Sequence, residues 1–292
     1  MGHRACFELA LPGNFRRDDF FSFHRRDPVG LCEQVEGLCL HKGMIWNGQP
    51  ACLALRFEEK CVQVVFDVEG SAADPEAVEW LASHLVGLDQ PVDDFERAHG
   101  AHPVLGALIH RHPGLRVPQT ATPFEALSWA IAAQQVSVKS AVSLRRRLVE
   151  RVGLRHSCGL YCYPDAQAVD TLTVHELQSL GFSATKAGAL KALSSGVLAG
   201  HLPLDEWMRN VPLDVMRERL LEVRGIGPWT VDYALLRGFG WLDGSLHGDV
   251  AVRRQLQQIL LHPVPMGLQE TQDWLKTFSP WRALVAAHLW AA

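Results

Sequence analysis

The stretch LEVRGIGPWT, Leu221–Thr230, decides the fold, and Asp249 follows it 19 residues later. It predicts a helix, a short glycine turn and a second helix, because Gly225 and Gly227 can adopt positive φ and Pro228 suits the first turn of a helix. Such a turn presents free backbone N–H groups at the positive end of a helix dipole, and together they form a site for an anion. The stretch therefore indicates a nucleic-acid phosphate as a ligand, with a carboxylate close by.

The size of the chain allows two domains with ordinary cores, since it has 292 residues of which 48% are hydrophobic. No apolar run reaches the roughly 18 residues that a membrane-spanning helix needs. The N-terminus lacks a basic segment followed by an apolar one, so we expect no secretion signal. We accordingly expect a cytoplasmic protein with no membrane partner.

The formal charge of −4 speaks weakly against a nucleic-acid partner, but the distribution of charge counts for more than its total. Residues 137–155 hold six basic residues and a single acidic one, Glu150. This local excess could contact phosphates, or it could be a solvated helix face without a partner. The basic residues are Lys139, Arg145, Arg146, Arg147, Arg151 and Arg155.

The seven cysteines form no Cys-x-x-Cys pair, and their odd number favours free thiols, several of them buried. Cys158 and Cys162 lie close to His156 in the sequence, which suggests a set of metal ligands. Their spacing fits zinc poorly and no second ligand pair stands nearby, so we expect no metal there.

The N-terminal part of the chain is predicted to be a mixed α/β domain with an antiparallel sheet. Residues 52–57 and 61–68 are typical of two strands joined in a hairpin. Residues 75–88 have a helical apolar pattern, and Asp74 before them is suited to cap a helix.

The boundary between two domains is predicted where prolines and glycines are dense, from residue 100 to 123. The first domain then covers residues 1–112 and the second covers 113–292, an α+β arrangement. The second is expected to be almost all helix from Pro123, with Thr122 as N-cap and a glutamate three residues later. Further helical patterns cover residues 174–180, 184–199, 213–223, 229–238, 250–261, 270–277 and 283–290.

Gln134 and Gln135 fall on the apolar face of the helical pattern that begins at Phe124 and extends to Val142. Two amides on such a face need hydrogen-bond partners. They are therefore either a hydrogen-bonded pair in the core or the site of a helix break, at a turn that faces nucleic acid.

Asp249 stands immediately before the helix expected from Val250, where aspartate commonly caps a helix. A helix N-terminus also favours negative charge and holds the carboxylate in place, so that it could stabilise a developing cation. Trp229, Tyr233 and Trp290 belong to the aromatic-rich last third of the chain. Such rings either pack in a core or stack on a flat base.

The segment Leu221–Asp249 resembles the helix-hairpin-helix, the glycine/proline-rich loop and the catalytic aspartate of the base-excision DNA glycosylase superfamily. More closely, the chain resembles the family of bacterial 3-methyladenine DNA glycosylase II from about residue 30 to residue 292. The resemblance implies an N-terminal mixed α/β domain, followed by a mostly helical domain of two lobes with a cleft between them. The segments that carry the closer likeness are IAAQQVSV at 131–138, GIGPWTVDY at 225–233, PWR at 280–282 and HLW at 288–290.

The resemblance also implies roles for individual residues. Asp249 would be the catalytic carboxylate, and Gln135 would be the wedge that fills the space left by a flipped base. Two positions depart from the family pattern, because the wedge is apolar there and Val250 replaces an aromatic residue. The base pocket would be lined by Trp229, Tyr233, Trp290, Gln134 and Phe23. The hairpin that binds a DNA phosphate would be formed by Arg224, Gly225, Ile226, Gly227 and Thr230.

The implied activity is to flip an alkylated purine out of double-stranded DNA and to hydrolyse its N-glycosidic bond, leaving an abasic site. Relatives with lyase activity carry a lysine where Trp229 stands, so we expect a monofunctional enzyme. No cysteine follows Cys162, so we expect no four-cysteine iron–sulfur cluster of the endonuclease III type. We expect a monomer without a cofactor or catalytic metal, apart from a monovalent cation at the hairpin carbonyls.

Two other functions stay open. One is a glycosylase for oxidised or deaminated purines, with or without lyase activity. The other is a non-catalytic DNA-binding module that uses the hairpin only to bind the DNA backbone. Replacement of Asp249 by asparagine separates an enzyme from a binding module, because the module would lose nothing.

Overall fold

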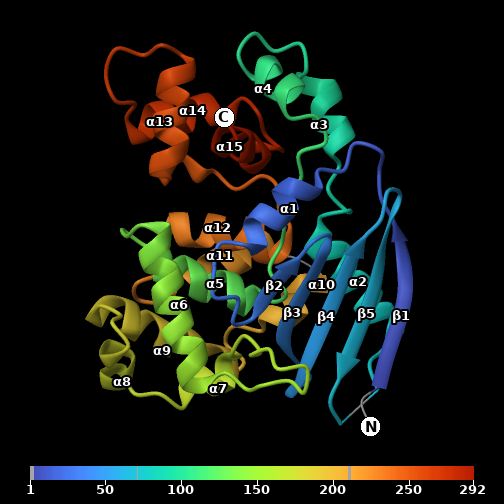
Figure 1. Ribbon diagram of the computed structural model, residues 1–292. Coiled ribbons are helices and arrows are strands. Elements are labelled where there is room, and N and C mark those ends of the chain that lie inside the picture. The colour runs from blue at the N-terminus through green and yellow to red at the C-terminus, as the bar shows by residue number, and fades with distance from the viewer. Residues whose placement is uncertain (1–2, 71, 210–211) are drawn as a thin grey trace.

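The N-terminal part contains an antiparallel five-stranded sheet with the strand order β1-β5-β4-β3-β2 (Figure 1). The computed structural model describes residues 3–70, 72–209 and 212–292. The predicted hairpin is confirmed as β4 and β5, which pair in register from Ala51 and Val68 to Phe57 and Val62. The strands are β1 His3–Ala10, β2 Glu33–Glu36, β3 Cys39–Trp46, β4 Gln49–Phe57 and β5 Cys61–Val68.

One face of the sheet forms the core of this part, because side chains alternate between the two faces along each strand. Leu53, Leu55 and Phe66 are fully buried on that face. Asp74 caps the second of the two helices that contribute to this core, as predicted, and accepts a backbone N–H of its first turn. The two helices are α1 Arg17–His24 and α2 Pro75–Val86.

The helices predicted from the sequence are all present. None of the described helices is long and apolar enough to span a membrane. The elements after α2 are α3 Val92–His99, α4 Leu105–Arg111, α5 Pro123–Ala133, α6 Val138–Val152, α7 Ala166–Asp170, α8 Val174–Ser179, α9 Ala184–Leu198, α10 Leu204–Arg209, α11 Leu213–Glu222, α12 Pro228–Phe239, the 3-10 turn η1 Leu246–Gly248, α13 Val250–Ile259, α14 Leu268–Lys276 and α15 Arg282–Trp290.

Two hydrophobic cores divide the helices into two lobes, as the resemblance implies. The first lobe is built around α7 to α11, and the second around α13 to α15 together with α3 and α4. Figure 1 shows the second lobe above α12 and the first lobe below it. Helices α5 and α12 contribute to both cores, with Leu127 and Val231 in the first and Trp129 and Tyr233 in the second.

The boundary between residues 112 and 113 stays a prediction, but the packing groups α3 and α4 with the C-terminal helices. Their side chains Phe95, Leu105 and Leu108 share a core with α15. The N-terminal segment thus supplies part of the second lobe as well as the sheet.

Helices α5 and α12 pack antiparallel and at close range. Near the end of α12, a Cβ on Gly238 would lie 2.9 Å from the Cβ of Ala126 and 3.0 Å from the Cα of Pro123. At the opposite end, Gln134 follows α5 and donates a hydrogen bond to Thr230 in the first turn of α12. The absence of a side chain at position 238 therefore permits the contact that places α12 against α5.

A buried cluster of four charged side chains joins the sheet to α5 and α6. Lys42 of β3 lies 2.9 Å from a carboxylate oxygen of Glu125 on α5 and 2.5 Å from one of Glu33 on β2. Arg145 of α6 pairs with the same two carboxylates, at 3.0 Å for Glu125 and 3.6 Å for Glu33. Two positive and two negative charges thus neutralise one another in a place where an unpaired charge would be costly.

Charge pairing outweighs burial inside this cluster. Burial raises the pKa of Glu33, but Lys42, Arg145 and His24 together hold that pKa well below its usual value. Burial lowers the pKa of Lys42, yet Glu125 and Glu33 raise it above its usual value. The pKa of His24 is lowered, mainly by burial, so its ring is neutral at neutral pH.

The basic stretch of residues 137–155 serves internal pairing more than the sequence suggested. Arg145 lies in the buried cluster, and Arg146 is 2.5 Å from Asp27. Lys139 and Arg147 are exposed. The local excess of positive charge is therefore only partly available to phosphates.

Replacement of Lys42 by methionine is expected to lower the free energy of unfolding by about 3–5 kcal/mol, because two buried carboxylates would then face one arginine. The measurement is chemical denaturation at neutral pH. The matched control is Arg151→Met, which breaks an exposed pair with Glu176 and should cost about 1 kcal/mol or less. A similar small loss in both variants would contradict the buried cluster.

Acid should also destabilise the wild type through this cluster. The folded chain holds the pKa of Glu33 below its usual 4.5, so the stabilisation is present above that value and is lost as the pH falls below it. In the Lys42→Met variant this acid-dependent loss should be smaller, since the main cation that lowers the pKa is gone.

Candidate active site

Asp249 follows η1 and caps α13, as predicted. Its Oδ1 accepts hydrogen bonds from the amides of Ala251 at 2.8 Å and Val252 at 3.1 Å. Both amides belong to the first turn of the helix, so the carboxylate lies at the positive end of the helix dipole. The side chain is half-buried. It is therefore fixed in orientation and still accessible to a ligand.

Two tryptophans from other helices also bind this carboxylate. Nε1 of Trp229, at the start of α12, donates to Oδ2 of Asp249 at 3.2 Å, and Nε1 of Trp290, at the end of α15, donates to Oδ1 at 3.3 Å. The ring centroid of Tyr233 lies 5.4 Å from that of Trp229 and 6.5 Å from that of Trp290. The structure thus brings three predicted pocket residues together with the predicted catalytic aspartate.

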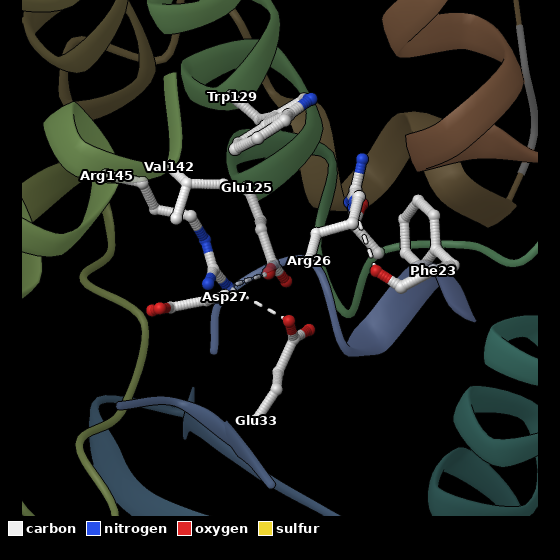
Figure 2. A pocket seen from close by; sticks show the side chains of 9 residues that line it. Phe23, Arg26, Asp27, Glu33, Glu125, Trp129, Val142 and Arg145 are labelled. Carbon is white, nitrogen blue, oxygen red and sulfur yellow. Dashed lines mark hydrogen bonds and ion pairs between the residues drawn. The ribbon is translucent and has the colours of Figure 1, made fainter. Parts of the chain in front are cut away.

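Phe23, on α1, contacts this aromatic group through a cation. The guanidinium of Arg237 lies 4.4 Å from the ring centroid of Phe23 and 5.6 Å from that of Trp290. A second guanidinium, that of Arg26, lies 3.8 Å from the Phe23 centroid (Figure 2). The predicted pocket residue Phe23 therefore stacks on two guanidinium groups.

Arg237 is a residue of this site that the sequence reasoning missed. The sequence did contain a signal for it. Trp229, Tyr233 and Arg237 are spaced four residues apart, which places them on one face of α12. Burial lowers the pKa of Arg237 to about 10, which leaves it charged at neutral pH. The aromatic group thus contains a resident positive charge, anchored by a hydrogen bond to the carbonyl of Pro118 at 2.8 Å.

A small cavity lies next to Phe23, where α1 and the sheet meet α5 and α6. Figure 2 shows Glu33 and Glu125 on one side of it, and Trp129 and Phe23 on other sides. Its volume of about 20 Å³ has room for about one water molecule. A purine does not fit there, so this cavity is not a place where a base could bind.

The turn between α11 and α12 forms the predicted hairpin. Gly225 has a φ of 96°, and a Cβ on it would lie 2.8 Å from the Cβ of Ala189. Gly227 does not use the positive φ that the sequence allows, since its φ is −108° and it caps α12. A Cβ on Gly227 would meet no atom of the described residues within 4 Å. The N-terminus of α12 is therefore open to the approach of an anion.

Gln134 holds the hairpin against the end of α5. Its Nε2 donates to the carbonyl of Gly225 and to Oγ1 of Thr230, both at 2.9 Å. Thr230 and Ile226 are buried, whereas Arg224 is exposed. Of the predicted phosphate-binding side chains, only Arg224 can therefore reach a ligand directly. The monovalent cation at the hairpin carbonyls stays a prediction.

The helical pattern from Phe124 to Val142 is broken at the glutamine pair, between α5 and α6, whereas a turn that faces nucleic acid stays a prediction. Lys186 of α9 donates from Nζ to the carbonyl of Ala132 at 2.8 Å and satisfies one of the last carbonyls of α5. Gln135 follows with a φ of 53° and is exposed. It stands on a protruding turn before α6, a position that suits a wedge.

Comparison with known proteins identifies the class to which this fold and site belong. A family model described as HhH-GPD superfamily base excision DNA repair protein matches residues 128–271, which include the protruding turn, the hairpin and Asp249. Residues 128–271 thus form a domain of this helix-hairpin-helix superfamily.

Within the superfamily, the chain is similar to DNA-3-methyladenine glycosylases. It is 30% identical to DNA-3-methyladenine glycosylase 2 of Escherichia coli (strain K12) over 190 residues, which are 64% of this chain and 63% of that protein. It is 29% identical to the probable bifunctional transcriptional activator/DNA repair enzyme AlkA of Mycobacterium tuberculosis (strain ATCC 25618 / H37Rv) over 213 residues, 70% of this chain and 40% of that protein. The chain thus spans less than two thirds of the length of either relative.

Solved structures confirm the α+β fold. The 3-methyladenine DNA-glycosylase from Archaeoglobus fulgidus superposes with a TM-score of 0.84 at 19% identity, covering 98% of this chain and 97% of that one. The Clostridium acetobutylicum 8-oxoguanine glycosylase/lyase, in complex with double-stranded DNA, superposes with a TM-score of 0.76 at 15% identity, covering 99% and 96%.

Replacement of Gln134 by alanine should loosen the hairpin, because the carbonyl of Gly225 and the buried hydroxyl of Thr230 lose their shared donor. We expect a loss of about 1–3 kcal/mol in the free energy of unfolding and faster hydrogen exchange of the hairpin amides. The control is the neighbouring Gln135→Ala, which changes an exposed side chain and should stay within about 0.5 kcal/mol of the wild type. Equal hydrogen-exchange rates of the hairpin amides in the two variants would argue against the role of Gln134 in holding the hairpin.

Proposed function

We propose that the protein is a monofunctional DNA glycosylase for alkylated purines of the 3-methyladenine and 7-methylguanine type, acting in base-excision repair. The observation that carries this proposal is Asp249, which is bound by Trp229 and Trp290 next to a helix N-terminus open to an anion. The named activity of the similar proteins supports it. This arrangement around Asp249 meets the two requirements of the reaction, a fixed carboxylate and a means to bind the DNA backbone.

DNA binding is proposed to begin with a backbone phosphate at the N-terminus of α12, next to Gly227. Arg224 and Lys139, both exposed, would contact neighbouring phosphates, so that affinity falls with added salt. The target nucleotide then leaves the duplex, and Gln135 fills the gap. A double-stranded substrate is implied, since a wedge fills the gap that a flipped base leaves in a duplex. One copy of the chain contains every residue named here, so a monomer would suffice.

The chemistry follows from the charge on the bound base. An alkylated purine with positive charge is attracted by the electron-rich rings of Trp229, Tyr233 and Trp290. The bond between C1′ and the base nitrogen breaks, the electron pair leaves with the base, and the sugar becomes an oxocarbenium-like cation. The carboxylate of Asp249 stabilises this cation, orients the water that adds to C1′ and accepts the proton that this water loses. The two tryptophan N–H groups fix the carboxylate for this task.

Arg237 favours a second candidate substrate class, the neutral purines that carry an exocyclic carbonyl, such as hypoxanthine. Its guanidinium repels a cationic base and can donate to a carbonyl oxygen. The test compares the release of hypoxanthine and of 3-methyladenine by the wild type from otherwise identical duplexes. Faster release of hypoxanthine would move the assignment to deaminated purines.

Replacement of Asp249 by asparagine should reduce base release by about 10²–10⁴-fold, because the negative charge opposite the developing cation is lost. Asparagine caps helices as well as aspartate does, so the fold should persist. The measurement is free base released from methylated duplex DNA, at equal protein concentration and with matched circular dichroism spectra.

The control for that variant is Asp165→Asn, which changes an aspartate that caps α7 through the amide of Ala168 at 2.8 Å. It should keep the activity of the wild type. Full base release by the Asp249 variant would remove this residue from the mechanism. No release by the wild type, combined with salt-sensitive DNA binding, would favour a non-catalytic binding module.

The product should be an intact strand with an abasic site. Trp229 stands where lyases carry their amine, and the Nζ of Lys186 is engaged by the carbonyl of Ala132. We therefore expect strand breaks only after alkali treatment and no covalent enzyme–DNA adduct with borohydride. The 8-oxoguanine glycosylase/lyase of Clostridium acetobutylicum is a suitable positive control. An adduct on the present chain would contradict the monofunctional assignment.

A further inference from the structure

A cluster of two thiols and an imidazole lies outside the site described, where β4 meets the loop between α6 and α7. Cys52 of β4 and the loop residues His156 and Cys158 place one ligand atom each within 4.8 Å of the others. Cys52 and His156 are 7% and 3% exposed, and Cys158 is exposed to solvent. The cluster is thus a half-enclosed site that opens on the side of Cys158.

The sheet directs Cys52 to this loop. Ala51 and Leu53 point into the sheet core, so Cys52 between them points to the opposite face. The loop is held against that face by the thiol of Cys162, which donates to the carbonyl of Ala51 at 3.7 Å. The amide of Tyr163 also donates to a carbonyl of β3 at 3.2 Å. The ligand atoms are therefore brought together by hydrogen bonds to backbone carbonyls of the sheet, which do not depend on a metal.

His156 carries an unsatisfied nitrogen in this site. Its Nδ1 accepts a hydrogen bond from the amide of Cys158 at 3.2 Å. Its Nε2 is buried and has no partner among the described residues. A buried ring nitrogen without a partner is costly, and a bound ion would satisfy it. Coordination through Nε2 requires the ring proton to move to Nδ1, which would then no longer accept from the Cys158 amide.

We propose that Cys52, His156 and Cys158 bind one zinc ion, with solvent as the fourth ligand on the exposed side. Two thiolates and one imidazole form a ligand set that zinc prefers. A tetrahedral ion with Zn–S bonds of about 2.3 Å draws its ligands closer than 4.8 Å, which small side-chain rotations achieve. Binding releases the two thiol protons.

The ion would connect the sheet to the helical part of the chain, because β4 supplies one ligand and the loop after α6 supplies the other two. The spacing of His156, Cys158 and Cys162 argued against zinc in the sequence, since no second set of ligands stood nearby. β4 supplies the missing ligand.

The test is the zinc content of the purified 292-residue chain after dialysis, measured by elemental mass spectrometry. We expect one zinc per chain in the wild type and its loss in Cys158→Ser and His156→Gln. The control is Cys6→Ser, which removes another exposed thiol, on β1, and should keep the zinc. Because Cys158 is exposed, its variant should fold, and circular dichroism verifies this.

A second measurement replaces zinc by cobalt. The wild type and Cys6→Ser should then absorb in the near ultraviolet through thiolate-to-cobalt charge transfer, and Cys158→Ser should lose most of this absorption. A chelator should lower the melting temperature of the wild type but not of Cys158→Ser. Zinc content that is absent even after added zinc, or equal in all variants, would overturn the proposal. A disulfide between Cys52 and Cys158 in the native chain would overturn it as well.

Discussion

The close contact between α5 and α12 is the constraint on which the rest of the structure depends. At one end, Gly238 lets the two helices approach without a side chain between them. At the other end, Gln134 donates to Gly225 and Thr230. Since helices are stiff, the contact fixes the hairpin before α12 and the protruding turn after α5 together. The proposed phosphate site and the proposed wedge are therefore positioned by one interface, and the face of α12 that carries Trp229 is directed to Asp249.

The buried charge cluster extends this arrangement to the sheet. The sequence suggests Glu125 as a partner in the cap of α5, and it does accept the amide of Ala121 at 3.1 Å. Its main partners are nevertheless Lys42 of the sheet and Arg145 of α6. His24 of α1 lies 3.1 Å from the carboxylate of Glu33 in this cluster, and this contact helps to keep α1, and with it Phe23, next to the aromatic group. The N-terminal part thus helps to form the site as well as to support it.

Much of the candidate site can be predicted from the sequence, and the parts that cannot be predicted depend on contacts between distant elements. The positions of Asp249 and the hairpin can be predicted from the sequence, because a helix cap or a turn depends on residues adjacent in the chain. The role of Arg237 cannot be predicted in this way, because it depends on how α1 places Phe23 against α12. The internal pairing of Arg145 is also hidden, since both of its carboxylates lie on other elements.

The sequence by itself determined the helices, the β4–β5 hairpin, the glycine turn and the carboxylate at the start of α13, because short-range sterics and hydrogen bonds specify these features. Only the tertiary structure decided which charges are neutralised, that the Arg237 guanidinium lies against Phe23 and Trp290, and that Cys52 meets His156. These outcomes depend on which faces of distant elements are buried against each other. Burial and charge pairing are properties of that assembly, so no local stretch of residues contains them.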